Sequence, residues 1–258
     1  MDTNFNDVIS SVRFTLKKSS TLSTVIPKLR EFLQKSNIRT VYIRSAQKAD
    51  FVLKTARLLG NDFIIVLECD ASGYKDLQKM LVEEDKNIAL LPTYDIGGSI
   101  TELKKITGLL PSTKTATRIF IKNDDKIRDK KKITKIFDNV MKVLGEKNVN
   151  FLWDCGFVLC SFSETQLGYF VQKGSDLTSW CPSFVNIDTN LDVRICDKLK
   201  QKDSITPNET LMKTIGTFGM ALMPYNSMGV LKECISCPYI KKRACSGGCR
   251  AEIIKSFR

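Results

Sequence analysis

Cysteines are the residues of this sequence best suited to chemistry, because eight of the nine lie late in the chain at spacings typical of metal sites. They form four pairs, which are Cys155 with Cys160, Cys181 with Cys196, Cys234 with Cys237, and Cys245 with Cys249. The Cys-x-x-Cys spacing of the third pair puts two sulfur atoms on one side of a tight loop. Gly247 and Gly248, inside the fourth pair, let the backbone pass close to a bulky inorganic group. The tail therefore predicts a metal site built from thiolates.

Histidine is absent from the sequence, and this narrows the chemistry further. Its absence excludes His-based acid–base catalysis, Ser-His and Cys-His nucleophile pairs, and zinc sites that mix Cys with His. Any metal must be held mainly by thiolate, which favours iron–sulfur clusters or an all-Cys zinc site. Eight thiols would complete two four-ligand clusters, while the Cys-x-x-Cys pair also suits zinc. Buried thiols without a metal are the third interpretation, which fits Cys155 and Cys160 best.

The composition is typical of a globular protein. Hydrophobic residues make up 43% and charged residues 26% of the 258 residues. No apolar run reaches the roughly twenty residues that span a bilayer, and residues 1–7 are polar and acidic, unlike a secretory signal. We therefore expect a cytoplasmic protein without a membrane partner. In that reducing compartment, cysteines serve as metal ligands or buried thiols rather than as structural disulfides.

The net charge of +12 predicts attraction to an acidic partner. Nucleic acid, an acidic peptide and an acidic protein all fit this charge. The run of lysines between residues 126 and 135 is explained by a solvated helix face, because aromatic residues do not alternate with it. We therefore do not expect nucleic acid binding.

Hydrophobic periodicity between residues 12 and 153 predicts six strands and five intervening helices. The expected strands cover residues 12–16, 41–43, 63–68, 88–91, 117–121 and 149–153. The expected helices cover residues 25–33, 51–59, 74–84, a segment after 97–98, and 127–144. This alternation is typical of an α/β fold with a parallel sheet, and it leaves open a partial barrel or a doubly wound sheet. The third strand is apolar throughout, so we expect it to be buried on both faces.

The character of the sequence changes after Trp153, where the cysteine-rich part begins and the apolar runs become short. Such a part is better held together by metal than by a large core, so we predict two domains, residues 1–153 and 154–258. Three acidic residues stand near the carboxyl ends of expected strands, where a barrel places its site, and we expect them to be solvated: Glu68, Asp70 and Asp95.

The spacing of the later cysteines also resembles a known family. The pattern Cys181-x9-Leu191-x4-Cys196, followed by Cys234-x2-Cys237-x7-Cys245-Ser-Gly-Gly-Cys249, resembles the SPASM domain at the carboxyl end of peptide-modifying radical S-adenosylmethionine (SAM) enzymes. Segments 154–160 and 186–196 are similar to the run that joins the barrel to the SPASM domain in one group of these proteins. The resemblance implies a partial (βα)6 barrel of radical SAM type in residues 1–153, followed by a small cysteine-rich, SPASM-like iron–sulfur domain in residues 154–258.

The resemblance further implies one or two [4Fe–4S] clusters. By analogy, one cluster would take three thiols of the tail, namely Cys234, Cys237 and Cys245. A second set would join Cys249 to two earlier thiols, Cys181 and Cys196. Cys155 or Cys160 would complete either set.

The expected barrel departs from the family where SAM chemistry takes place. Radical SAM enzymes hold a cluster with a CxxxCxxC loop after the first strand, but residues 17–21 here are Lys-Lys-Ser-Ser-Thr. The usual Gly-Gly-Glu segment, which holds the amino group of SAM, is replaced by Arg-Ser-Ala-Gln at residues 44–47. Cys69 is the only cysteine before residue 154, and we expect it to be a buried structural thiol. We therefore expect neither SAM binding nor radical SAM activity.

The cysteine-rich part departs from the family in two places. The family usually carries glycine where this chain has Leu191, so the hairpin before Cys196 must turn by other means. The interval between Cys237 and Cys245 is longer than usual, and no cysteine follows Cys249.

These features together predict an iron–sulfur protein without its own SAM cluster. The resemblance implies a role in peptide (RiPP-type) modification, in which the chain would partner an active radical SAM enzyme or a precursor peptide. Its clusters would relay electrons or shape a peptide groove. Two alternatives remain open: an enzyme that uses an auxiliary [4Fe–4S] cluster with an open iron site, and an interaction protein stapled by zinc.

Overall fold

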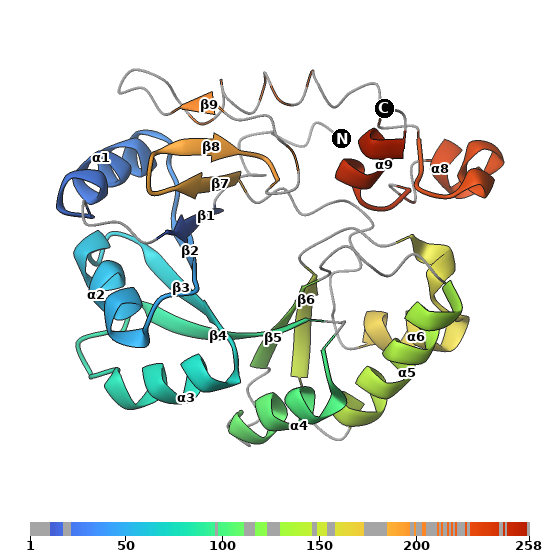
Figure 1. Cartoon of the computed structure of the whole chain (residues 1–258), viewed down its shortest axis with the longest axis horizontal. Coiled ribbons are helices and arrows are strands. Elements are labelled where there is room, and N and C mark those ends of the chain that lie inside the picture. Colours follow the sequence, from blue (N-terminus) through green and yellow to red (C-terminus); the bar gives the residue numbers. More distant parts are fainter. Residues whose placement is uncertain are drawn as a thin grey trace. The chain divides into compact units, whose positions relative to one another are not determined.

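The fold is seen in a computed structural model of the chain (Figure 1). Its described residues are 11–17, 22–95, 98–110, 117–122, 130–145, 149–153, 158–172, 185–196, 199 and 203–204, together with residues 211–256 apart from 212, 214–215, 217, 219, 221–224, 226–227, 243–244 and 246. Within these ranges, strands and helices alternate in an α/β arrangement.

Six strands alternate with five helices in the part of the chain where periodicity predicted them. The strands are β1 (Ser11–Leu16), β2 (Thr40–Ser45), β3 (Ile64–Cys69), β4 (Ile88–Asp95), β5 (Thr117–Lys122) and β6 (Val149–Trp153). The helices are α1 (Leu22–Lys35), α2 (Ala49–Leu59), α3 (Ala71–Met80), α4 (Ile100–Leu109) and α5 (Lys130–Gly145).

Neighbouring strands run mostly parallel, in the order β6-β5-β4-β3-β2-β1-β7-β8-β9. β1 pairs with β2, and β2 with β3, in parallel, as do β4 with β5 and β5 with β6. β7 (Val185–Asp188) adds to β1 in parallel, and β8 (Asp192–Arg194) and β9 (Asp203–Ser204) follow it antiparallel. The predicted class, α/β with a largely parallel sheet, is confirmed. Periodicity did not predict the addition of β7 to β9.

The chain divides into two compact units, each made from two stretches of sequence. The first unit contains residues 1–91 and 183–221, and the second contains residues 92–182 and 222–258. The second unit also holds several short elements: η2 (Leu159–Ser161), α6 (Glu164–Gln172), η4 (Lys232–Ser236), α8 (Pro238–Lys241) and α9 (Arg250–Ser256). A domain boundary between residues 153 and 154 stays a prediction.

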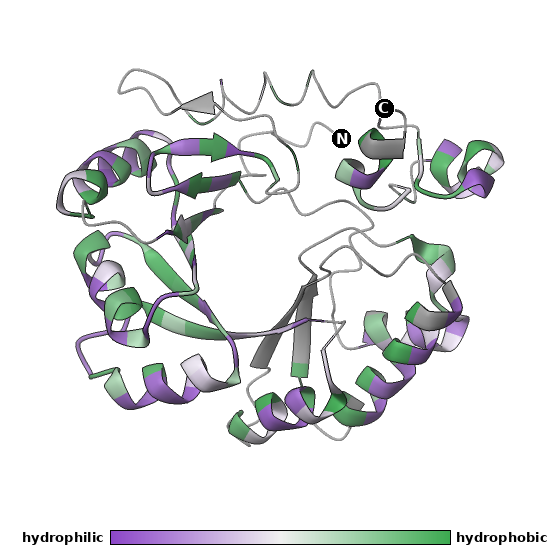
Figure 2. Ribbon diagram, viewed as in Figure 1, coloured by the Kyte–Doolittle hydropathy of each residue, from purple (hydrophilic) through white to green (hydrophobic). Residues whose placement is uncertain are grey.

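Amphipathic patterns explain how the first unit buries its core. Val12 and Phe14 alternate with less buried residues on β1, while Leu29 and Leu33 repeat at helical spacing on α1, and all four are fully buried. Figure 2 shows hydrophobic and hydrophilic residues sharing the same helices, as this pattern requires. α1 packs beside α2, and α2 beside α3. Gly60, at φ +83°, ends α2 where the sequence predicted.

The third strand differs from its prediction. The sequence favoured burial on both faces of residues 63–68, but Ile64 is 55% exposed and Val66 is half-buried. Ile65 and Leu67, which point to the opposite face, are fully buried. β3 therefore has one fully covered face, although its sequence is apolar on both.

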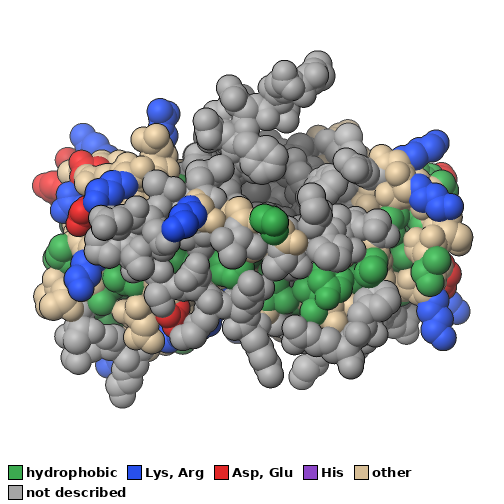
Figure 3. All heavy atoms as spheres, turned by 90° about the horizontal axis from the view of Figure 1, so that it is seen from above, with side chains coloured by type: hydrophobic (Ala, Val, Ile, Leu, Met, Phe, Trp, Pro, Cys, Tyr) green, Lys and Arg blue, Asp and Glu red, His purple; other side chains and the backbone are tan. Residues whose placement is uncertain are grey.

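The described surface carries many basic side chains. Figure 3 shows Lys and Arg side chains more often than Asp and Glu on one face of the molecule, in keeping with the net charge of +12. None of the described helices is both long and apolar enough to cross a membrane.

Candidate metal centre

Four thiols of the second unit are neighbours, although they come from three separate segments. Burial is the main cause that raises the pKa of the Cys234 thiol above its usual value. The charges of three other thiols raise it further: Cys160, Cys245 and Cys237. Cys237 and Leu159, which directly precedes Cys160, also pack against the cluster of Cys234 and Cys245, so the four thiols belong to one neighbourhood. Cys160, which follows β6 in the chain, thus joins the three thiols of the tail.

Local structure explains how the Cys-x-x-Cys pair is presented. Cys234 lies inside η4, and Cys237 follows that turn directly before α8, which begins with Pro238. The Cys237 amide donates a hydrogen bond to the Cys234 carbonyl at 3.2 Å and closes the loop between them. This short turn holds both thiols on one stretch of backbone.

Apolar packing surrounds these sulfur atoms on one side. Cys234 and Cys245 are each 7% exposed, and they pack with Ile240 in a small buried cluster. Leu159 and Leu231 cover the same cluster. Cys237 is half-buried and Cys160 is exposed, so the four-thiol neighbourhood has a buried side and a solvent side.

Glycines let the backbone come close to the thiols. A Cβ atom on Gly229 would lie 2.4 Å from the Cys234 sulfur, and one on Gly247 would lie 2.4 Å from the Met228 carbonyl oxygen. Gly247 has φ +75°, a conformation that favours glycine, and its amide donates a hydrogen bond to the Cys245 sulfur at 3.4 Å. Gly247 and Gly248 thus pack against backbone and valine side chains, and their predicted approach to an inorganic group stays a prediction. Gly229 is a further glycine that sequence spacing alone did not indicate.

This donor set fits a metal or cluster held by thiolates. Four cysteines with a backbone N–H directed at one sulfur match the donors of iron–sulfur and all-Cys zinc sites. Within the described ranges, no group of three or more Cys, Asp or Glu side chains is already arranged to hold a metal ion. The structure thus supplies neighbouring thiols in a glycine-lined loop rather than a finished coordination geometry. Thiolates ligate metal only after losing their protons.

The other predicted ligands fall outside this neighbourhood or outside the described residues. Cys249 is 8% exposed in the second unit, where its carbonyl accepts hydrogen bonds from the first turn of α9. Cys196 follows β8 in the first unit and is half-buried. Cys155 and Cys181 lie outside the described residues. A second ligand set built from these four stays a prediction.

Leu191 shows how the hairpin before Cys196 turns without glycine. Its φ is +62°, the left-handed conformation that glycine adopts most easily. The carboxylate of Asp188 accepts hydrogen bonds from the amides of Asn190 at 2.9 Å and Asp192 at 3.2 Å. The Asp188 carbonyl also accepts a hydrogen bond from the Leu191 amide at 2.8 Å. These bonds hold the turn against the backbone strain at Leu191.

Glu68 is paired rather than solvated, which corrects the sequence-based expectation. Its side chain is 0% exposed and accepts hydrogen bonds from Arg13 at 2.8 Å and Arg44 at 2.6 Å. With both carboxylate oxygens bonded to arginines, Glu68 is part of a buried ion-pair network. Lys17, after β1, pairs in the same unit with Asp188 at the end of β7.

Asp70 and Cys69, next to Glu68, have structural roles. The Asp70 side chain accepts a hydrogen bond from the Gly73 amide at 2.8 Å and caps α3. The helix therefore begins at Ala71 rather than at residue 74, and it ends at Met80 rather than at residue 84, where Leu81 takes extended backbone. Cys69 is 9% exposed, with its sulfur 3.9 Å from the Leu91 carbonyl oxygen, so the predicted buried thiol is confirmed.

The turn after β4 is held by backbone contacts. The Gly98 amide donates to the Asp95 carbonyl at 2.8 Å, and the Tyr94 hydroxyl donates to the Gly98 carbonyl at 3.0 Å. Burial raises the pKa of Tyr94 to about 12, so the phenol keeps the proton that it donates. Gly97 lies outside the described residues. These hydrogen bonds give Gly98 a structural role, as expected for an ordinary loop.

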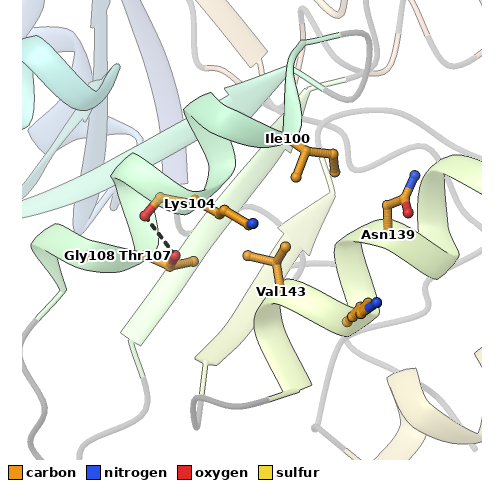
Figure 4. Close-up of a pocket in the computed structure, with 7 residues that line it drawn as sticks. Ile100, Lys104, Thr107, Gly108, Asn139 and Val143 are labelled. Atoms are coloured by element: carbon orange, nitrogen blue, oxygen red, sulfur yellow. Dashed lines mark hydrogen bonds between the residues drawn. The ribbon is translucent and has the colours of Figure 1, made fainter.

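A groove between α4 and α5 is the second feature of this unit that could hold a ligand (Figure 4). Its volume is about 480 Å³, and its lining consists of Ile100, Lys104, Thr107, Gly108, Asn139, Lys142 and Val143. The Thr107 hydroxyl donates to the Lys104 carbonyl within the same helix at 3.0 Å. None of these lining side chains is a thiolate or a carboxylate, so the groove offers no ligands to a thiophilic metal.

A scan against protein-family models and a search of curated proteins both found no match to this chain. The fold and the site therefore define only a class: an α/β protein whose second unit gathers thiols in a glycine-lined loop.

Proposed function

We propose that this chain is an iron–sulfur protein that holds a [4Fe–4S] cluster through Cys160, Cys234, Cys237 and Cys245. One observation carries the proposal: Cys234 and Cys245 share a buried cluster, against which Cys237 and Leu159, the residue before Cys160, pack. A cluster needs four thiolates from a chain that approaches it closely, and Gly229 lies directly against the Cys234 side chain. When bound, such a cluster supplies one-electron transfer.

The chain's own residues prepare this site in three ways. Burial keeps the Cys234 thiol protonated until a metal displaces the proton. The Gly247 amide donates to the Cys245 sulfur, a contact that tunes iron–sulfur centres. The apolar side chains of Ile240, Leu159 and Leu231 exclude water from the buried side.

Zinc is the second candidate, because a Cys-x-x-Cys pair with two further thiols also suits a structural zinc ion. The close backbone passage around Cys234 and Cys245 favours the bulkier cluster. An enzyme with an open iron site is less well supported at this centre. The proposed set already counts four thiols, with Cys160 as the fourth, so it would leave no vacant ligand position.

At the level of the whole protein, we propose a partial (βα)6 barrel followed by a SPASM-like part, acting as an accessory protein in peptide (RiPP-type) modification. The partner would be an active radical SAM enzyme or a precursor peptide. Two features of the first unit support a barrel without SAM chemistry. Arg44 pairs with buried Glu68, and Lys17 pairs with Asp188, so these strand ends are engaged in ion pairs.

Anaerobic reconstitution with iron and sulfide tests this proposal, followed by quantification of iron, sulfide and zinc. We expect iron and sulfide in near-equal amounts, and no 5′-deoxyadenosine after addition of SAM and reductant. Zinc without sulfide would favour the zinc candidate. Formation of 5′-deoxyadenosine would contradict a barrel without SAM chemistry.

A further inference from the structure

Two exposed hydrophobic side chains flank the Cys-x-x-Cys loop. Ile235 is 84% exposed and Tyr239 is 61% exposed, and they stand two residues before and two residues after Cys237. Among the described residues of the second unit, no other large hydrophobic side chain is exposed to this degree. Exposed apolar side chains bordered by polar residues are typical of protein interaction sites.

Basic residues border this pair in the same segment. Lys232, Lys241 and Lys242 are all exposed, while Glu233 is the only described acidic residue between positions 232 and 242. The segment therefore carries a net charge of +2, from three positive charges and one negative.

One thiol of this segment is partly accessible to solvent. Cys237, between Ile235 and Tyr239, is half-buried, in contrast to Cys234 and Cys245, which are buried. Any protein that covers Ile235 and Tyr239 therefore stands directly beside the least buried thiol of the Cys-x-x-Cys pair. Apolar contacts with a charged border are suited to brief, weak encounters, such as those of electron carriers.

We infer that the segment 232–242 is the docking surface for an acidic electron-carrier protein. This inference rests on the proposed function for its purpose, but the docking itself depends only on side chains of the described segment. Ile235 and Tyr239 supply the apolar contact, and the three lysines attract an acidic border on the partner and speed the encounter. Raised ionic strength must therefore weaken the complex.

Binding of an acidic [2Fe–2S] ferredoxin tests the inference, measured by calorimetry with the full chain before and after reconstitution. We expect weak, salt-sensitive binding that falls about tenfold in the double variant Ile235→Ser/Tyr239→Ser and by a similar factor in Lys241→Glu/Lys242→Glu. The matched controls are Val82→Ser and Lys75→Glu, exposed positions of the first unit, which should leave binding unchanged.

Equal binding by the patch variants and the controls would overturn the inference, as would the lack of any salt-sensitive binding. Because binding is measured whether or not iron is present, this failure is distinct from failure of the proposed function. Reconstitution without iron would overturn the cluster, while patch-dependent binding of the ferredoxin would still support the docking surface.

Discussion

At the residue scale, the raised pKa of the Cys234 thiol makes both folding stability and metal affinity depend on pH. Burial and neighbouring thiols raise its pKa, so the folded chain holds this proton more tightly than the unfolded chain does. The resulting stability is fully present below the pKa of an unfolded cysteine and is lost as the pH rises through the raised pKa. Metal affinity changes in the opposite direction and rises with pH, because a metal must displace the thiol proton.

We therefore predict that metal affinity increases with pH at and above neutrality. The rise should be about tenfold per pH unit for each thiol that must lose its proton. Cobalt(II) titrations at several pH values, followed by the thiolate-to-cobalt absorbance, measure it. Cys234→Ser should reduce the slope, whereas an affinity that does not change with pH would contradict thiol ligation.

Leu191 gives a second prediction at this scale. A leucine at φ +62° costs about 1–2 kcal/mol, while glycine adds roughly 0.5–1 kcal/mol of backbone entropy to the unfolded chain. Leu191→Gly should therefore raise the free energy of unfolding by up to about 1 kcal/mol. Leu191→Val is the control with the opposite sign, since a β-branched residue fits this conformation worse. Chemical denaturation distinguishes them, and a less stable glycine variant would argue against strain at this turn.

At the element scale, periodicity predicted the regular βα part well and the short elements poorly. α1 and β1 are amphipathic over their whole length, so their local patterns are sufficient to locate them. β7 and β8 have only four and three residues, and β7 joins the sheet through pairing with β1, which is distant in sequence. The pairing of β7 with β1 therefore cannot be predicted from the local hydrophobic pattern of either strand.

The loop at Gly229 allows a sharp prediction for the metal site. Gly229→Ala would place a methyl group 2.4 Å from the Cys234 sulfur, so we expect loss of most bound iron and a stability decrease of about 1–3 kcal/mol. Gly168→Ala in α6 is the matched control, because a methyl group there meets no atom within 4 Å. The control should bind iron normally and gain about 0.5–1 kcal/mol. Equal iron in both variants would exclude a role for the close approach at Gly229.

At the scale of the whole molecule, the resemblance to the SPASM domain implied Cys234, Cys237 and Cys245 as one group, but it left their fourth ligand open. Cys160 reaches them because the second unit is assembled from residues 92–182 and 222–258. Sequence spacing contains no information on which distant segments meet. For the same reason, the sequence did not reveal that Glu68 lies between Arg13 and Arg44, which come from different strands.

Iron content of single Cys→Ser variants tests the central claim most directly, because it asks whether four particular thiols act together. After anaerobic reconstitution, the variants at positions 160, 234, 237 and 245 should each lose most of the iron and sulfide that the unmodified chain binds. Cys69→Ser, in which the buried thiol of the first unit is changed, should retain both. A Cys160→Ser variant that keeps its full iron and sulfide content would contradict the four-thiol centre.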